Sequence, residues 1–286
     1  MALMQRETRV AYGPVPHGLA AEPLAEQTWH IEPDQFLLRG MGDHWFHYRK
    51  GEGITVERGA GADVSEESLW LNGTLYSAIA SLNGLMPIHA SAVAHAGRVF
   101  AFTGPGGAGK STLTAALGQH GMPMFCDDTL VLDISSADAI ECLPGHKRLK
   151  LTEQALELSE AERQEKVSRT VEKYYAQPRS GSQAQPLPLA ALVFLDDGEE
   201  MVLEPVRGGR AMLRLQDDHY TANLFSLARK FDPAARFAML ARFSQQVDLI
   251  EFARPRDTKL FSAGAELVAG FIRNWKSRPN SATTAA

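Results

Sequence analysis

The sequence predicts an α/β protein, because apolar runs of strand length and amphipathic helical patterns follow one another along the chain. The apolar run Arg98–Thr103 is followed directly by a glycine-rich segment and then by a helix start. Further runs typical of strands lie at 190–197, 201–206 and 247–253. Helical patterns occupy 211–215, 223–230, 233–243 and 263–273. The glycine-rich segment therefore stands at a junction between a strand and a helix.

The first 84 residues predict a small β-rich part. Residues 1–27 are weakly patterned and fit either a loose arm or an early strand. Short alternating runs separated by glycines predict a β-meander over 29–56, and 66–84 suit one helix that ends at Gly84. We expect residues 1–84 to pack on a larger core of residues 85–275, with 276–286 as a disordered tail.

A second strand is predicted directly before the strand that leads into the glycine-rich segment. Residues 86–94 predict another strand, and Ala96 and Gly97 predict a tight turn, so the two strands form a hairpin. After the glycines, 122–133 predict a strand, a turn at two aspartates and a second strand. We expect a charged helix at 153–176 and a flexible connection at 179–189.

Residues 104–111 follow the pattern G-x-x-x-x-G-K-S, which is the P-loop pattern. Glycines let backbone N–H groups surround a polyphosphate, and the N-terminus of the next helix adds to that anion site. Lys110 would reach the β- and γ-phosphates of the nucleotide, either ATP or GTP, and the Ser111 hydroxyl would hold Mg²⁺. A simple turn is the alternative, although every fixed position matches. The expected nucleotide-binding residues are Gly104, Gly106, Gly107, Ala108, Gly109, Lys110, Ser111 and Thr112.

Two adjacent carboxylates follow the loop after one helix and one strand. Phosphoryl transfer needs a carboxylate near the metal and often a second one beside the attacking hydroxyl. Asp127 and Asp128 can share these tasks because neighbouring side chains diverge, although a solvated turn is the alternative. His89 lies on the first arm of the hairpin, either at the phosphate end or at the opposite end.

Basic residues supply candidates for binding an acceptor. Lys147, Arg148 and Lys150 follow a Pro-Gly pair and form either a substrate-binding loop or a plain basic loop. There are four later basic candidates, each of which is better explained as a surface residue than as a ligand contact; they are Arg210, Arg214, Arg254 and Arg256.

Composition excludes several classes of function. The chain has 286 residues, 44% of them apolar and 22% charged, as in an ordinary globular protein. Its net charge of −5 argues against a broadly basic nucleic-acid surface. No apolar stretch approaches the roughly 20 residues of a membrane span. Without a secretory signal pattern, and with Cys126 and Cys142 expected as reduced thiols, we expect a cytoplasmic protein.

Four segments together resemble the catalytic domain of HPr kinase/phosphorylase. They are H-A-S-A-V from His89, the G-P-G-G-A-G-K-S-T loop, C-D-D from Cys126, and P-G-H-K-R-L-K-L from Pro144. More closely, they look like the HPr kinase-related proteins found beside peptide-modification genes. Roughly residues 30 to 262 of the chain follow that layout. The resemblance implies an atypical P-loop fold with a mixed sheet, related in architecture to phosphoenolpyruvate carboxykinase.

The same resemblance implies transfer of the γ-phosphate of ATP to a serine hydroxyl. By motif matching, Lys110 and Ser111 are the phosphate and metal residues, and Asp127 is a Mg²⁺-associated carboxylate. Asp128 is the general base, and His89 lies close to the transferred phosphate. Some similar proteins phosphorylate the C-terminal serine of lasso-peptide precursors. The glycine-rich signature that HPr kinases carry beyond the aspartates has no clear counterpart here.

We therefore expect a Mg·ATP-dependent serine kinase acting on a peptide or small protein. A small-molecule kinase is one alternative. A nucleotide-gated binding protein that presents residues 147–150 to a partner is another. Neither nucleic acid nor a membrane is an expected partner, and a homo-oligomer is compatible with the sequence.

Overall fold

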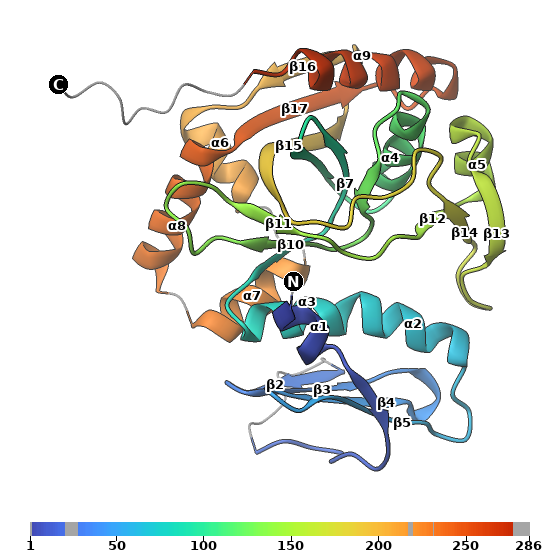
Figure 1. Cartoon of the computed structure of the whole chain (residues 1–286), viewed down its shortest axis with the longest axis vertical. Coiled ribbons are helices and arrows are strands. Elements are labelled where there is room, and N and C mark those ends of the chain that lie inside the picture. The colour runs from blue at the N-terminus through green and yellow to red at the C-terminus, as the bar shows by residue number, and fades with distance from the viewer. Residues whose placement is uncertain (1, 21–27, 217–219, 231, 277–286) are drawn as a thin grey trace.

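The computed structural model describes residues 2–20, 28–216, 220–230 and 232–276, and shows two parts stacked along the long axis (Figure 1). The protein is mixed α/β, with several mixed sheets. The tail predicted at 276–286 lies outside the described residues from 277 onward, as do 21–27 of the predicted N-terminal arm.

A five-stranded sheet forms most of the N-terminal part. Its order is β1-β5-β4-β3-β2, with β1 parallel to β5 and the other pairs antiparallel, so the predicted meander is present as β2 to β5. The first elements are α1 (Ala2–Glu7), β1 (Val10–Tyr12), β2 (Trp29–Ile31), β3 (Gln35–Arg39), η1 (Met41–Asp43), β4 (Trp45–Arg49) and β5 (Gly53–Glu57).

The single helix predicted at 66–84 is wrong, because the chain forms two helices here. They are α2 (Val64–Asn72) and α3 (Thr74–Leu82), separated by Gly73. The backbone of Gly73 has φ −107° and ψ −103°, and its N–H donates to the Leu69 carbonyl oxygen. This conformation ends α2 and changes the direction of the chain before α3 begins.

The larger part is built on a mixed sheet of nine strands within the described residues. Its hydrogen-bonded order is β6-β10-β11-β15-β8-β7-β9, and β17 pairs with β15 and β16. The strands are β6 (Met86–Ile88), β7 (Ala90–His95), β8 (Arg98–Thr103), β9 (Met124–Cys126), β10 (Leu130–Asp133), β11 (Glu141–Leu143), β15 (Leu187–Asp197), β16 (Val202–Pro205) and β17 (Asp248–Arg254).

Helices cover both faces of this sheet (Figure 1). On one face, α4 and α9 pack on apolar side chains of β8, β15 and β17, including Phe100, Phe102 and Phe252. On the other face, α6 and α8 enclose a second core with Phe243 and Val99. The helices are α4 (Lys110–Gln119), α6 (Gly208–Leu215), α7 (Tyr220–Arg229), α8 (Pro233–Gln246) and α9 (Phe261–Asn274), with the short η2 (Thr258–Leu260) before α9.

The predicted hairpin before the glycine-rich segment is present. Strands β7 and β8 pair antiparallel, and Ala96 and Gly97 both have positive φ angles of 46° and 71° at their turn. Positive φ at both central residues is the geometry that fits a two-residue hairpin turn. The predicted strand at 86–94 is nevertheless two strands, because β6 pairs with β10 whereas β7 pairs with β8 and β9.

Three parallel strands determine where a ligand can bind. Strand β15 lies between β8 and β17 and runs parallel to both, so the three carboxyl ends lie at one edge. Thr103, Asp197 and Arg254 end these strands. In sheets with parallel strands, ligands bind outside this edge.

The charged helix predicted at 153–176 is wrong beyond its first turns. Helix α5 (Glu153–Ser159) ends at Glu160, whose φ is 48°, and a hairpin of β13 (Glu162–Lys166) and β14 (Tyr174–Gln177) follows. Together with β12 (Leu149–Leu151) they form a small sheet in the order β12-β14-β13. Strand β13 is largely exposed, so it lacks the apolar alternation that would have distinguished it from a polar helix.

The N-terminal part and the larger part share an apolar core. Val131, Leu143 and Leu224 of the larger part belong to the same buried cluster as Phe36 and Leu75 of the N-terminal part. Helix α3 also packs against α7. Cys126 and Cys142 are both buried and unpaired, which agrees with reduced thiols.

We predict that Gly104→Ala destabilises the fold, whereas Gly106→Ala in the same loop does not. Gly104 has φ +151°, and a Cβ there would lie 2.7 Å from the Leu195 carbonyl oxygen. The backbone conformation alone would cost a residue with a side chain about 1–3 kcal/mol. A Cβ at Gly106 would meet no heavy atom within 4 Å. Urea unfolding of both variants checks this, and equal free energies of unfolding would contradict it.

Candidate functional site

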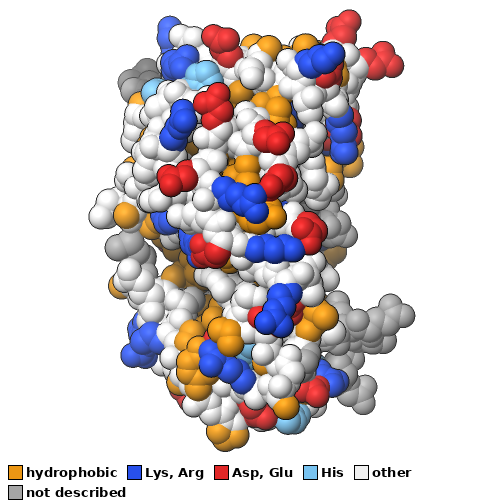
Figure 2. Space-filling model, turned by 90° about the vertical axis from the view of Figure 1, so that its right-hand side faces the viewer, with side chains coloured by type: hydrophobic (Ala, Val, Ile, Leu, Met, Phe, Trp, Pro, Cys, Tyr) orange, Lys and Arg blue, Asp and Glu red, His pale blue; other side chains and the backbone are white. Residues whose placement is uncertain are grey.

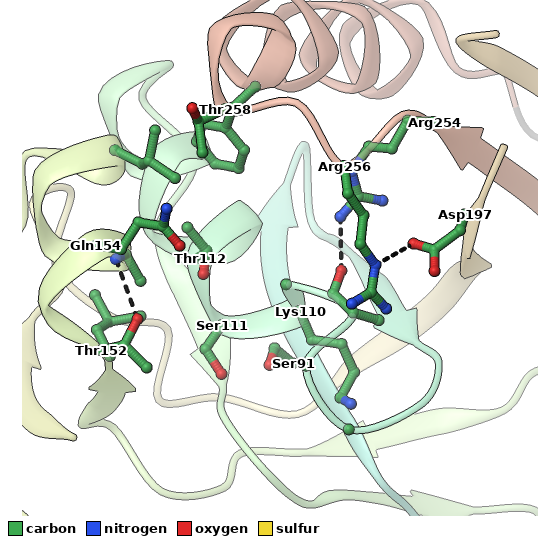
Figure 3. Close-up of a pocket in the computed structure, with 18 of the residues that line it drawn as sticks. Ser91, Lys110, Ser111, Thr112, Thr152, Gln154, Asp197, Arg254, Arg256 and Thr258 are labelled. Atoms are coloured by element: carbon green, nitrogen blue, oxygen red, sulfur yellow. Dashed lines mark hydrogen bonds and ion pairs between the residues drawn. The ribbon is translucent and has the colours of Figure 1, made fainter. Parts of the chain in front are cut away.

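A pocket of about 510 Å³ opens at the carboxyl ends of the parallel strands (Figure 3). Its walls come from the glycine-rich loop (residues 104–111), β7, the turn after β9, β12, α5 and the chain after β17. The volume suits a nucleotide-sized ligand, since small-molecule sites span roughly 300–1,000 Å³. The pocket therefore brings together segments that are far apart in the sequence.

The glycine-rich loop presents a helix N-terminus to this pocket. Gly104, Gly107 and Gly109 have positive φ, which lets the backbone curve around the space in front of α4. Gly109 caps α4 without a side-chain hydrogen bond, and the first turn of the helix holds no acidic residue. The N–H groups and the positive end of the helix dipole at Lys110 can therefore bind an anion.

Lys110 is buried at this helix start, with 7% of its surface exposed. Its Nζ donates to the carbonyl oxygens of Gly104 at 2.9 Å and Pro105 at 3.2 Å. Burial lowers the pKa of Lys110, although the charges of Asp127 and Asp128 oppose this change. The ammonium group thus lies within its own loop, directly beside the anion site.

Asp127 connects three elements through one buried carboxylate. Its Oδ1 accepts hydrogen bonds from Ser111 Oγ at 2.7 Å and from Ser91 Oγ at 2.5 Å, and its Oδ2 accepts one from the Lys150 backbone N–H at 3.0 Å. Only 2% of Asp127 is exposed. Ser91, on β7, was not singled out from the sequence, because the pairing of β7 with β9 is what brings it beside Asp127.

The Ser111–Asp127 pair has the chemistry that Mg²⁺ requires. Magnesium prefers oxygen ligands, and it is commonly held by one or two carboxylates plus the phosphates of the substrate. Among the described residues no group of three or more His, Cys, Asp or Glu side chains could hold a metal by itself. The pair therefore fits an ion that phosphates and water complete, rather than an all-protein cage.

Asp128 faces the pocket on the other side of the same turn. Its φ of 74° is rare for a residue with a side chain. Lys150 Nζ donates to Asp128 Oδ2 at 2.9 Å, and His89 Nδ1 lies 3.5 Å from Oδ1 and 3.0 Å from the Asp128 carbonyl oxygen. Burial would raise the pKa of Asp128, but the charge and hydrogen bond of Lys150 outweigh it and lower that pKa. Asp128 is therefore a carboxylate at neutral pH.

The three basic residues predicted to bind substrate lie in different places. Lys150 lines the pocket, whereas Lys147 and Arg148 line a second hollow beside β14. Lys147 donates to the Phe125 carbonyl oxygen and lies 4.8 Å from the centre of its ring. Arg148 packs over the ring of Tyr175 and pairs with Glu165, which leaves Lys150 as the one of the three beside the aspartates.

Two of the later arginines also border the pocket (Figure 3). Arg254 Nη2 donates to the Ala108 carbonyl oxygen at 2.6 Å, and Arg256 Nε donates to Asp197 Oδ1 at 2.7 Å. The sequence favoured a surface position over a ligand contact for both; Arg256 is exposed, with 65% of its side chain accessible, whereas Arg254 is partly buried. Arg254 ends β17 and Arg256 follows it, and β17 runs parallel to β15 and β8; this position is the signal that could have identified them, but strand order cannot be seen in the sequence. Arg210 and Arg214 instead pair with acidic residues outside the pocket.

Comparisons with known proteins give little further guidance. No family model matches the chain, and no curated protein matches it. A solved structure similar to it is the Hpr(Ser) kinase/phosphatase from Coxiella burnetii, with a TM-score of 0.36 and 14% sequence identity. The match covers 66% of this chain and 95% of that chain. At this level no family assignment follows, and the case for a function rests on the site itself.

None of the helices in the described part of the chain is both long and apolar enough to cross a lipid bilayer.

Lys147 should give the protein a distinctive dependence of stability on pH. Burial lowers the pKa of Lys147 from 10.5 to about 8. Between these values the unfolded chain binds a proton that the folded chain has lost, so the free energy of unfolding rises with pH. We expect wild type to gain stability relative to Lys147→Met as pH rises from about 8 to 10.5. Urea unfolding across this range measures the gain, and a constant difference between the two proteins would contradict it.

Proposed function

We propose that the protein is a Mg·ATP-dependent kinase that transfers the γ-phosphoryl group to a serine hydroxyl of a peptide or small protein. One observation carries this proposal: adjacent carboxylates diverge, so that Asp127 bonds Ser111 of the glycine-rich loop while Asp128 faces the open pocket. One carboxylate would then hold a metal at the phosphates, and the other would receive the acceptor.

The glycine-rich loop would act as a P-loop toward ATP. Its N–H groups and the N-terminus of α4 would bind the β- and γ-phosphates. Lys110 would exchange the carbonyl oxygens of Gly104 and Pro105 for phosphate oxygens, which are stronger partners for an ammonium group. Arg254, hydrogen-bonded to Ala108, would hold the loop in the shape that these contacts need.

Ser111 and Asp127 would hold Mg²⁺, and the ion would supply positive charge to the phosphates. Ser91 and the Lys150 N–H would keep the Asp127 carboxylate in place, since both already donate to it.

The transfer itself requires one bond to break and one to form. The bond between the γ-phosphorus and the oxygen that bridges to the β-phosphate breaks, and ADP leaves with the bonding electron pair. A new bond forms from the acceptor oxygen to phosphorus, and the acceptor proton passes to the Asp128 carboxylate. Because such transition states are loose, a weakly basic carboxylate suffices, and Asp128 acts mainly by orienting the hydroxyl.

Lys150 and His89 would position Asp128 for this task. The Lys150 ammonium group fixes one carboxylate oxygen at 2.9 Å, and His89 Nδ1 bonds the Asp128 carbonyl oxygen. The second carboxylate oxygen can then accept a hydrogen bond from the incoming hydroxyl.

The choice of serine on a peptide rests on the motif resemblance in the sequence, with the C-terminal serine of a lasso-peptide precursor as the first acceptor to test.

The test is intact-mass spectrometry of serine-bearing precursor peptides incubated with the protein, ATP and Mg²⁺. We expect a gain of one phosphoryl mass with wild type. Lys110→Ala should lose both transfer and nucleotide affinity, whereas Asp128→Asn should keep nucleotide affinity and slow transfer at least about 100-fold. Asp138→Asn, on an exposed loop, is the matched control.

Three outcomes would contradict the proposal in different ways. Unchanged transfer by Asp128→Asn would remove this residue from the mechanism. Transfer to small hydroxyl compounds but to no peptide would indicate a small-molecule kinase. ATP binding with no phosphorylated product of either kind would favour a nucleotide-gated binding protein.

A further inference from the structure

The loop between β13 and β14 crosses from the larger part toward the N-terminal part. This loop, residues 167–173, is called the strap below. The Val167 N–H donates to the Lys173 carbonyl oxygen at 2.8 Å, and the Lys173 N–H donates to the Val171 carbonyl oxygen at 2.8 Å. These bonds close the strap at its base and fix the backbone of Lys173.

The tip of the strap is bonded to helix α2. Thr170 Oγ1 donates to Glu66 Oε1 at 2.6 Å, and Glu66 is buried, with 8% exposed. Arg169 Nε lies 3.8 Å from Asp63 Oδ2 at the start of the same helix. Figure 1 shows the strap reaching down from β13 and β14 to α2. The N-terminal part therefore holds the strap in position.

Lys173 differs from the other basic residues of this hairpin. Arg163, Lys166 and Arg169 each pair with a carboxylate, namely those of Glu153, Glu172 and Asp63. Figure 2 looks onto this face, where side chains of opposite charge lie next to one another. Among the described residues, Lys173 forms no such ion pair. It lines the pocket together with Lys110 and Asp128 instead.

The charge of Lys173 acts on two other residues that line the pocket, Lys110 and Asp128. Burial is the largest cause of the lowered pKa of Lys110, and the Lys173 ammonium group lowers it further. Lys173 also contributes, after Lys150 and His89, to lowering the pKa of Asp128. Lys173 is thus electrostatically close both to the phosphate-binding lysine and to the carboxylate that would receive the acceptor.

The other cations of the pocket already have partners. Lys150 is paired with Asp128, Arg254 donates to the Ala108 carbonyl oxygen, and Arg256 is bonded to Asp197. In phosphoryl transfer, negative charge spreads over three equatorial oxygens that need cations on more than one side. Lys110 would reach these oxygens from the glycine-rich loop, and Lys173 lines the same pocket from the strap.

We propose that Lys173 is a further catalytic residue, whose ammonium group contacts the phosphoryl group during transfer and reaches it from the strap rather than from the glycine-rich loop. This inference rests on the proposed kinase function. It gives the N-terminal part a role in catalysis, because Glu66 fixes the strap through Thr170. The far end of α2 also borders the site: a Cβ on Gly73 would lie 3.8 Å from Asp128 Oδ2.

The test compares Lys173→Met with Lys166→Met, a lysine of the same hairpin that is paired with Glu172. Both lysines are exposed, so neither change should disturb folding. The probe is MgATP, followed as ADP release with and without a serine-bearing precursor peptide, and nucleotide affinity is measured by calorimetry. We expect kcat to fall about 100-fold for Lys173→Met, with little change in nucleotide affinity. Lys173→Arg should restore part of the rate, and Lys166→Met should resemble wild type.

A double-mutant cycle separates the effect of the Lys173 charge on kcat from the effect of the strap's hydrogen bond to α2. Thr170→Val should lower kcat in wild type but have little further effect in Lys173→Met, because the strap acts through this lysine. An equal effect of Thr170→Val in both backgrounds would overturn that link. If wild type turns over and Lys173→Met is as active as Lys166→Met, the inference fails while the kinase function stands. If wild type releases no ADP with or without peptide, the kinase function itself fails.

Discussion

The buried carboxylate of Asp127 is the interaction on which the rest of the site depends. A carboxyl group with 2% exposure is stable only when its oxygens are hydrogen-bonded. Ser111, Ser91 and the Lys150 N–H satisfy them, and these donors come from the start of α4, from β7 and from β12. One side chain therefore ties the glycine-rich loop, the hairpin and the small sheet to a common point, and the pocket takes its shape from that point.

The position of Asp127 also determines what its neighbour can do. With Asp127 directed to the loop, the left-handed backbone of Asp128 directs the second carboxylate toward the pocket. Lys150 serves both aspartates, since its backbone N–H bonds Asp127 and its Nζ bonds Asp128. Strand β12, which carries Lys150, pairs with β14. The strap, which precedes β14 in the chain, is hydrogen-bonded to α2 through Thr170 and Glu66. The two parts of the protein are thus connected through the site itself, rather than only through the apolar core that they share.

Local patterns allowed the sequence to predict the parts of the site that depend on neighbouring residues. The strand, glycine-rich loop and helix, the turn at Ala96 and Gly97, and the strand–turn–strand around Asp127 all follow from short-range backbone requirements. The contact of Ser91 with Asp127 and the contact of Arg254 with the loop depend on strand order, which no local pattern encodes. The β13–β14 hairpin was missed for another reason. Its outer strand, β13, is largely exposed. It contacts β14 through cation–ring packing such as Arg163 on Tyr174 rather than through apolar side chains, so it carries no apolar periodicity.

The most direct measurement of the central role of Asp127 is calorimetric titration of ATP into wild type and Asp127→Asn, with and without Mg²⁺. Asparagine keeps the shape of the side chain and can still accept from Ser111 or Ser91, so the fold should persist. We expect Mg²⁺ to strengthen ATP binding to wild type at least about tenfold, which corresponds to about 1.4 kcal/mol, and to have little effect on Asp127→Asn. Equal strengthening by Mg²⁺ in both proteins would show that Asp127 does not hold the metal, and would contradict the division of tasks between the two aspartates.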